Sequence, residues 1–341
     1  MTDRTIAVLP KLESLAGPAS FYGRFTSTAR KRGYTIHNDP AKKDVDAVLV
    51  IAGTKHIPAL LKAKRRGVRV VQRLDNINWQ HRYMNTGLYH YVRSEINNVM
   101  MQTVRKHFAD TIVYQSEFAK QWWIDVYKST GKGNSIIHNG VNLEEFSPVG
   151  PETPPSDHYR IQVLEGRMAG GQEMGLENAI RMAQIVQQKV TKKVELVVIG
   201  RVAPELQAYW KANAGIWVNF VGQIPRNEVP SRDRSAHVLF SADINGACPN
   251  VVVESLACGL PVISFDTGAL PELVETEGGI IVPWGTNVWK LETPIFEPLA
   301  NAAIEVIENN DHFRKAARVR AERLFNIESV VDRYLDALFH E

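Results

Sequence analysis

The chain has 341 residues, 44% of them apolar and 23% charged, which is typical of a globular protein long enough for two domains of roughly 150 residues each. Its apolar runs are shorter than the roughly 18 to 20 residues that a membrane span needs, and the start MTDRTIAVLP lacks the apolar core of a signal peptide, so we expect a cytoplasmic protein. The two cysteines, Cys248 and Cys258, fit neither a CxxC motif nor a disulfide framework, which favours small packing residues.

Charge is unevenly distributed along the chain. Residues 1–150 contain 22 Lys/Arg and 12 Asp/Glu, a balance of +10, whereas the remainder contains 18 and 25, a balance of −7. The basic clusters at residues 30–32 and 62–66 lie at the ends of helical patterns, where they suit the helix dipole and form a solvated face. Attraction to an anionic membrane surface or acceptor is the alternative. We find no aromatic-interleaved basic motif of the RNA-binding kind, which argues against a nucleic-acid partner.

Short β-branched runs alternate with helical patterns through the first half of the chain. The predicted strands are residues 6–9, 47–51, 68–73 and 111–115, and the predicted helices are residues 20–32, 89–107 and 117–127. This order indicates a parallel sheet wrapped by helices. The loop after the first strand contains Gly17 and Pro18 before a helix, which suits either a simple turn or the close approach of a phosphate or sugar.

A second alternating series follows a proline-rich segment. Four prolines between Pro148 and Pro155 indicate a linker. The predicted strands beyond it are residues 161–164, 195–199, 217–221, 237–240, 261–265 and 279–282, separated by helical patterns such as residues 176–188. We therefore expect two doubly wound domains with a cleft between them, and ligands beyond the carboxyl ends of the strands.

One carboxylate, Glu254, stands alone in an otherwise uncharged run from Ala247 to Phe265. Pro249 suits the start of a helix there and Gly259 its end, and the helix is apolar nearly all round, so we expect it to be buried. A buried carboxylate is costly unless hydrogen bonds satisfy it. Either Glu254 is held by the backbone or a buried arginine, or it accepts from two adjacent hydroxyls, as a ribose would present.

The segment EGRMAGG begins at the end of the first strand of the second series. Arg167 is expected to point into the cleft, where a guanidinium can fork onto a diphosphate; an exposed arginine in a flexible loop is the alternative. The glycines do not have the GxGxxG spacing of a dinucleotide site. A DxD sequence, Asp44 to Asp46, precedes its strand rather than following it, and the histidines have no zinc-ligand spacing, so we expect no metal site.

Four motifs together resemble a known family: SIIHNGVNLEEFSP, the pair GR at residues 166–167, ESLACGLPVI from Glu254, and DTGALPE from Asp266. They are similar to the family 4 retaining glycosyltransferases (group 1 glycosyl transferases) with the GT-B fold. The resemblance implies two doubly wound, Rossmann-like domains with an interdomain cleft. Residues 1–148 would bind the acceptor and be completed by a C-terminal helix at 327–341, and residues 149–326 would bind the nucleotide sugar.

The resemblance also implies roles for individual residues. Arg167 would neutralise the diphosphate, Glu254 would hold the ribose, and amides of two helix starts would touch phosphates or sugar. Asp75 stands where the family often has a histidine, and it completes the predicted catalytic set with Arg167 and Glu254. The predicted nucleotide-binding residues are Gly17, Gly166, Arg167, Asn250, Val251, Val252, Glu254 and Gly268. The family typically needs no metal, so no cofactor is expected beyond the donor itself.

Two positions depart from the family pattern. Gly246 stands where the family usually has a second acid that reads the donor sugar's hydroxyls, and Met174 stands where a lysine usually precedes a glycine. We expect a retaining, metal-independent transfer of a sugar from a nucleoside-diphosphate sugar to a hydroxyl acceptor, for example in polysaccharide biosynthesis. An anionic or lipid-linked acceptor would bring the basic domain to the inner face of a membrane. The alternatives are a non-catalytic subunit of the same fold and an epimerase or phosphorylase, whose cofactor-binding lysine site we do not find.

Overall fold

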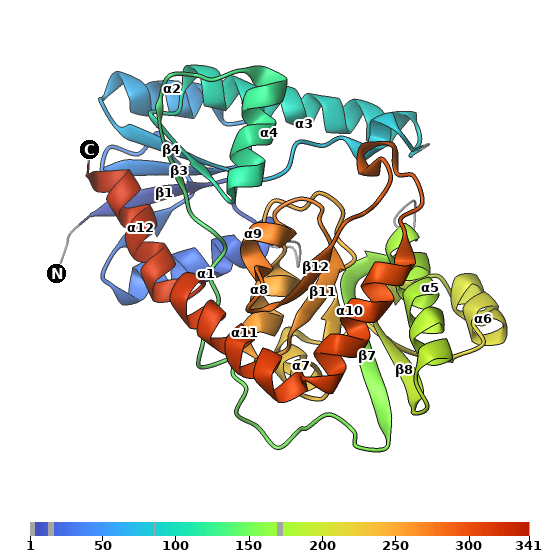
Figure 1. Cartoon of the computed structure of the whole chain (residues 1–341). Helices are drawn as coiled ribbons and strands as arrows, with labels where there is room; N and C mark the ends of the chain where they lie inside the picture. Colours follow the sequence, from blue (N-terminus) through green and yellow to red (C-terminus); the bar gives the residue numbers. More distant parts are fainter. Residues whose placement is uncertain (1–3, 13–16, 85, 169–172, 341) are drawn as a thin grey trace. The chain divides into compact units, whose positions relative to one another are not determined.

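The computed structural model describes residues 4–12, 17–84, 86–168 and 173–340, with only the backbone of Arg167 (Figure 1). The chain forms two compact units. Unit 1 comprises Met1–Gly140 with Phe325–Glu341, and unit 2 comprises Val141–Leu324. Among the described residues, no helix is both long enough and apolar enough to cross a lipid bilayer.

Unit 1 is built on a six-stranded parallel sheet with the strand order β2-β1-β3-β4-β5-β6. Its strands are β1 (Thr5–Leu9), β2 (Thr35–His37), β3 (Ala47–Ile51), β4 (Arg69–Leu74), β5 (Thr111–Tyr114) and β6 (Gly133–Ile136). The central strands β1 and β3 are buried along their whole length, as expected for a sheet covered on both faces.

Helices cover the two faces of this sheet with separate apolar clusters. Helix α1 (Gly17–Lys31) and the C-terminal helix α12 (Ile327–Phe339) pack on one face, where Phe21 and Tyr334 contact each other at a ring-centroid distance of 5.0 Å. Helices α2 (Ile57–Arg65) and α3 (Leu88–His107) pack on the other face through Leu60, Ala63 and Val104. Helix α4 (Glu117–Tyr127) follows β5, and a short 3-10 helix η1 (Gln80–Arg82) precedes α3.

Residues 138–140, the HNG part of the SIIHNGVNLEEFSP motif, make contacts within unit 1. The side-chain oxygen of Asn139 accepts a hydrogen bond of 2.7 Å from the buried guanidinium of Arg73. A Cβ atom on Gly140 would lie 3.0 Å from the Cα of Ile327, so only glycine allows α12 to approach this closely. These contacts give Asn139 and Gly140 packing roles within unit 1.

Unit 2 is a second six-stranded parallel sheet with the order β12-β11-β10-β7-β8-β9. Its strands are β7 (His158–Met168), β8 (Lys193–Val202), β9 (Trp217–Gly222), β10 (Val238–Phe240), β11 (Val262–Phe265) and β12 (Gly279–Val282). The strand order reverses direction between β7 and β10, which pair directly. In doubly wound sheets such a reversal is the point where ligands bind.

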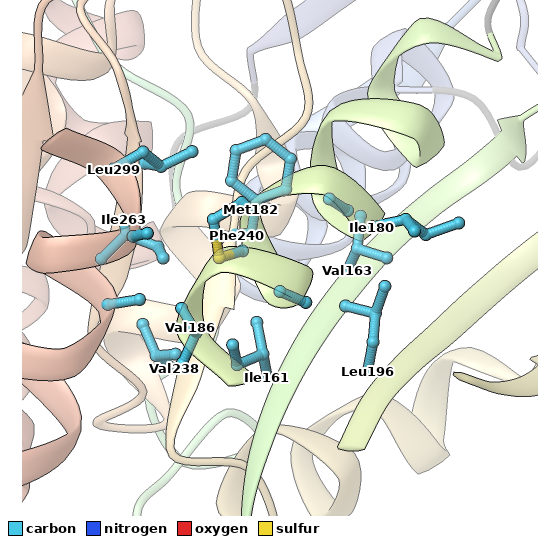
Figure 2. Close-up of a cluster of buried hydrophobic side chains, with 14 of the residues drawn as sticks. Ile161, Val163, Ile180, Met182, Val186, Leu196, Val238, Phe240, Ile263 and Leu299 are labelled. Atoms are coloured by element: carbon cyan, nitrogen blue, oxygen red, sulfur yellow. The ribbon is translucent and has the colours of Figure 1, made fainter. Parts of the chain in front are cut away.

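The core of unit 2 lies between the sheet and the helices on it. Figure 2 shows Ile180, Met182 and Val186 of α5 (Met174–Lys189) beside strand residues such as Ile161 and Phe240. Helix α10 (Phe296–Glu308) adds Leu299 from the other side of the cluster. The remaining helices are α6 (Pro204–Asn213), α7 (Val229–Arg234), α8 (Asn250–Ala257), α9 (Leu270–Val274) and α11 (Asn310–Leu324), with 3-10 helices η2 (Arg226–Glu228) and η3 (Val288–Lys290).

The strands and helices predicted from the alternation of apolar runs are confirmed, with ends that shift by at most a few residues. The largest extension is in β7, which begins at His158 and runs to Met168. The predicted α8 is also confirmed as a buried helix that ends before Gly259, whose φ of +68° is the left-handed conformation that favours glycine at this position.

Candidate functional site

Two carboxylates flank the strand reversal of unit 2. Glu165 lies near the end of β7, and Asp243 lies in the loop that follows β10. Because β7 and β10 are paired and parallel, their carboxyl ends lie at the same edge of the sheet. The candidate site is therefore the edge of the sheet formed by residues 164–168 and 241–250.

A one-residue bulge shapes this end of β7. Leu164 pairs with Ile199 and Arg167 with Arg201, so three steps along β7 match two along β8. The bulge brings the carbonyl of Glu165 so near Gly200 that any Cβ there would collide with it, and Gly200 has a φ of +139°. Bulges of this kind re-aim side chains next to functional sites. Here the bulge places Glu165 and the exposed Gly166 beside the strand reversal.

The two carboxyl groups influence each other's protonation. Burial raises the pKa of Asp243 to about 6. Burial, and next the negative charge of Asp243, raise the pKa of Glu165 to about 8. Near neutral pH the pair therefore holds a proton, so it presents both a hydrogen-bond donor and acceptors. Such a pair can both donate a hydrogen bond to a hydroxyl group and accept one from it.

Asp243 occupies the space left by the glycine at position 246. A Cβ atom on Gly246 would lie 2.4 Å from an Asp243 carboxylate oxygen and 2.9 Å from Cγ of Pro249. With Asp243 in this position, a side chain at residue 246, where the family pattern has an acid, would collide with the Asp243 carboxylate. Sequence reasoning missed both Asp243 and Glu165, because neither stands at the motif's spacing. The only signal was their position after predicted strands.

Glu254 is buried on α8, one turn from the start of the helix. Its Oε1 lies 3.6 Å from Nη2 of Arg226, which is an ion-pair distance but longer than a hydrogen bond. The Arg226 side chain is partly exposed and its guanidinium lies 5.6 Å from the centre of the Phe146 ring. The structure thus gives Glu254 an arginine neighbour, and this neighbour comes from a segment that the sequence did not single out.

A second acid, Asp233, lies in the same buried region. Its carboxylate accepts a hydrogen bond of 2.7 Å from Gln162 and one of 3.2 Å from the Ser255 hydroxyl. Burial raises the pKa of Asp233 to about 7. The hydrogen bond from Gln162 opposes this rise, and the negative charge of Glu254 adds to it. Because its partners are internal, Asp233 supports α8 rather than facing a ligand.

The predicted residue Gly268 holds two loops of the site together. The amide of Ala269 donates to the carbonyl of Gly246 at 2.9 Å, and the Thr267 hydroxyl donates to the carbonyl of Asp243 at 3.3 Å. A Cβ atom on Gly268 would lie 2.5 Å from the Gly246 carbonyl oxygen, and its φ is +61°. Only glycine allows this approach, so the structure gives Gly268 a packing role at the site.

The start of α8 lies directly after this pair of loops. Its first turn contains the predicted residues Asn250, Val251 and Val252, and the first amides of a helix point away from it toward any anion there. Asn245, just before it, is buried with a φ of +57°, and its side-chain nitrogen has no hydrogen-bond partner among the described residues. Strained backbone and an unpaired buried donor are typical of binding sites.

The remaining predicted residues are distributed as follows. The backbone of Arg167 lies at the end of β7, whereas its side chain lies outside the described residues. Met174 begins α5 and packs against the apolar core of unit 2, so no cation stands at the position of the family's lysine. Gly17 and Asp75 are in unit 1, where Gly17 begins α1 and Asp75 follows β4.

Asp75 is partly buried at the carboxyl end of β4. Its backbone carbonyl accepts a hydrogen bond of 2.8 Å from the Trp123 indole. Burial raises the pKa of the Asp75 carboxyl group, and the positive charge of Arg73 opposes this rise.

The DxD sequence, Asp44 to Asp46, lies before β3. The Asp46 carboxylate accepts a 2.7 Å hydrogen bond from the amide of Thr5, so it is part of the sheet's end.

Comparison with solved structures identifies the class to which this fold belongs. The chain is similar to sucrose-phosphate synthase from Thermosynechococcus elongatus (15% identity, 98% of each chain covered, TM-score 0.72). It is also similar to WaaG, a glycosyltransferase involved in lipopolysaccharide biosynthesis (13% identity, 99% of this chain and 100% of that one, TM-score 0.70). A third similar structure is HepE from Anabaena in complex with UDP and glucose (14% identity, 99% and 100% covered, TM-score 0.66). The fold is therefore GT-B.

The family of unit 2 follows from its sequence. Residues 161–301 match the family model described as Glycosyl transferases group 1, and they include Glu165, Asp243 and Glu254. No curated protein sequence matches the chain. Unit 2 thus contains a domain that matches the group 1 glycosyl transferases, which are enzymes, and the resemblance of the motifs at residues 166–167, 254–263 and 266–272 to this family is confirmed.

Proposed function

We propose that the protein is a retaining, metal-independent glycosyltransferase that moves a sugar from a nucleoside-diphosphate sugar to a hydroxyl acceptor. The observation that carries the proposal is Glu254. It is a buried carboxylate one turn from the start of α8, in a group 1 domain, at the carboxyl edge of a parallel sheet. A carboxylate there can accept hydrogen bonds from both hydroxyls of a ribose.

The diphosphate would lie between the end of β7 and the start of α8. Arg167, with the amides of Val251 and Val252, would stabilise the negative charge that develops on the leaving diphosphate. Gly166 and Gly268 leave backbone accessible at the two loops beside it. Catalysis of this kind is mostly electrostatic and positional. The UDP and UDP-glucose complexes of HepE support this choice of donor class.

The donor sugar would lie against Glu165 and Asp243. These carboxyl groups share the edge of the sheet with α8, and together they can both donate to and accept from sugar hydroxyls. In this proposal Asp243 takes over the hydroxyl-reading role of the acid missing at Gly246.

The acceptor would bind unit 1, where Asp75 follows β4 and Gly17 begins α1. A carboxyl group of raised pKa suits an acid or base near a reacting hydroxyl. The basic balance of residues 1–150 supports an anionic or lipid-linked acceptor. A place at the cytoplasmic face of a membrane, in polysaccharide biosynthesis, would match such an acceptor.

A non-catalytic subunit is the second candidate, and Met174 favours it. Its thioether packs against the core of unit 2 where the family has a cation, so the site has one positive charge fewer for the diphosphate. Asp243 favours the enzyme, because its carboxylate lies beside Gly246 and can supply the second acid. The two candidates differ in whether any nucleotide sugar is consumed.

Incubation with a panel of nucleotide sugars tests the proposal. The wild type should release one nucleoside diphosphate, and NMR of the product should show the donor's anomeric configuration. Arg167→Ala should slow release about 30- to 1,000-fold, corresponding to about 2–4 kcal/mol of transition-state stabilisation. The control Arg181→Ala changes an exposed arginine of α5 and should be neutral. Unchanged turnover in Arg167→Ala would refute its role, and no turnover of any donor would favour the subunit.

A further inference from the structure

The outer face of α3 is apolar. Leu88 is 79% exposed, Tyr89 80% and Val99 63%, and Val92 and Ile96 are also exposed. Positions 88, 92, 96 and 99 recur at helical spacing, so these side chains form one stripe along the helix. We call this set, Leu88, Tyr89, Val92, Ile96 and Val99, the α3 stripe.

The inner face of the same part of α3 is polar. The side chains that α3 buries in its first three turns are Ser94 and Asn98. Asn98 accepts from the amide and the side chain of Asn78 at 2.9 Å each, and donates to the Asn78 carbonyl at 2.9 Å. A helix on a globular domain normally buries its apolar face. This half of α3 does the reverse, so its apolar face is not accounted for by the core of unit 1.

The layer that contains the α3 stripe is basic. Helices α2 and α3 cover the same face of the sheet (Figure 1). Residues 55–66 contain five Lys/Arg and no acid. Of these, Lys55, Lys62, Arg65 and Arg66 are exposed, and Leu61 is an exposed apolar side chain beside Lys62.

On α3 itself the balance is also positive. Its one acid, Glu95, accepts two hydrogen bonds, of 2.7 and 2.9 Å, from Arg82 and lies 2.8 Å from His81. These contacts, chiefly the one to Arg82, lower the pKa of Glu95 to about 2, so it stays ionised and paired. Arg93 and Lys106 remain exposed on the helix.

We propose that the outer layer of α2 and α3 docks on an anionic lipid surface. The α3 stripe enters the boundary between headgroups and acyl chains, and Lys62, Arg65 and Arg93 contact the anionic headgroups. A helix with an apolar face, an aromatic side chain such as Tyr89 at the edge of that face, and lysine and arginine side chains beside it has the composition of an interfacial helix. Self-association of this face would oppose bases to bases, which is unfavourable, so a second copy of the chain fits the charges less well.

Co-sedimentation with vesicles tests the docking surface. The wild type should bind vesicles of phosphatidylcholine with phosphatidylglycerol, bind pure phosphatidylcholine weakly, and lose binding as salt shortens the Debye length. The double variant Ile96→Gln/Val99→Gln should bind at least about tenfold more weakly than the wild type, since two apolar side chains no longer insert. Glutamine is at least as good a helix former as the residues it replaces, so α3 should persist.

Matched variants separate the apolar and the electrostatic contributions. Val319→Gln alters an exposed valine of α11 in unit 2 and should leave vesicle binding unchanged. Lys62→Gln/Arg65→Gln should weaken binding to the anionic vesicles about tenfold or more, because each base near such a surface contributes about fivefold, whereas the exposed Lys315→Gln on α11 should not.

Three results would overturn the proposal. They are a wild type that does not bind anionic vesicles at low salt, stripe and base variants that bind like the wild type, and a wild-type dimer that Ile96→Gln/Val99→Gln converts to monomers without any vesicle binding. Melting temperatures of all variants, measured alongside, should match the wild type within a few degrees. If Ile96→Gln/Val99→Gln fails to fold, the surface pair Lys62→Gln/Arg65→Gln decides alone.

Discussion

Glu165→Gln should change how the stability of the protein depends on pH. An unfolded glutamate ionises near its ordinary pKa of 4.5, whereas the folded protein holds the Glu165 proton up to about pH 8. Between these values the folded state binds one more proton than the unfolded state, so stability falls as pH rises, by at most about 1.4 kcal/mol per pH unit. Glutamine cannot titrate, so the variant lacks this slope.

The difference between variant and wild type isolates the titration of the Glu165–Asp243 pair, because titrating groups outside this pair contribute equally to both proteins and cancel. From pH 5.5 to 7.5 we expect the melting temperature of Glu165→Gln, relative to the wild type, to rise by several degrees. This corresponds to about 1–3 kcal/mol at roughly 2–4 °C per kcal/mol. Thermal melts at four pH values measure this change. The control Glu305→Gln, on the exposed face of α10, should differ from the wild type by the same melting temperature at every pH. A difference for Glu165→Gln that is equally constant would refute a shared proton at the site.

Three further expectations concern the same edge of unit 2. Gly268→Ala places a Cβ against the Gly246 backbone at a φ of +61°, so we expect a loss of about 3 kcal/mol or more, seen as a lower melting temperature. Gly246→Ala should displace the Asp243 carboxylate and weaken the donor sugar more than the free nucleoside diphosphate in calorimetric titrations; equal weakening would contradict the replacement of the missing acid. Treatment with EDTA should leave transfer unchanged, and a loss that magnesium restores would show that the reaction uses a metal.

The sequence predicts the frame of both units well, because buried parallel strands are continuous β-branched runs. The strands Ala47–Ile51 and Gly279–Val282 begin and end at the predicted residues. The short edge strands β2 and β6 were not predicted, since their side chains are mostly polar or exposed and leave no apolar run. The orientation of α3 also escapes prediction, because periodicity locates its apolar stripe but not the side on which the sheet lies.

The candidate site was predicted only in part. Glu254 was found because a lone charge in an apolar run is conspicuous, and Gly268 because its motif is specific. Asp243 and Arg226 were not found. The position of Asp243 depends on the conformation of the loop after β10, and Arg226 lies in the 3-10 helix η2, far from Glu254 in the sequence. The bulge at Glu165 depends in the same way on Gly200, a residue on another strand.

The central claim is that Glu254 holds the ribose of a nucleoside diphosphate. Thermal shifts with UDP, GDP, ADP and dTDP, without added metal, test it in the wild type, in Glu254→Gln and in the control Glu305→Gln. One ribonucleotide should stabilise the wild type and the control by about 2.7 kcal/mol at a hundredfold excess over Kd, and its 2′-deoxy form should bind about 1–3 kcal/mol more weakly. Glu254→Gln should keep its own melting temperature and lose that shift. If no nucleotide stabilises the wild type, or if Glu254→Gln melts early while its folded fraction binds normally, Glu254 is the internal partner of Arg226 and the donor site lies elsewhere.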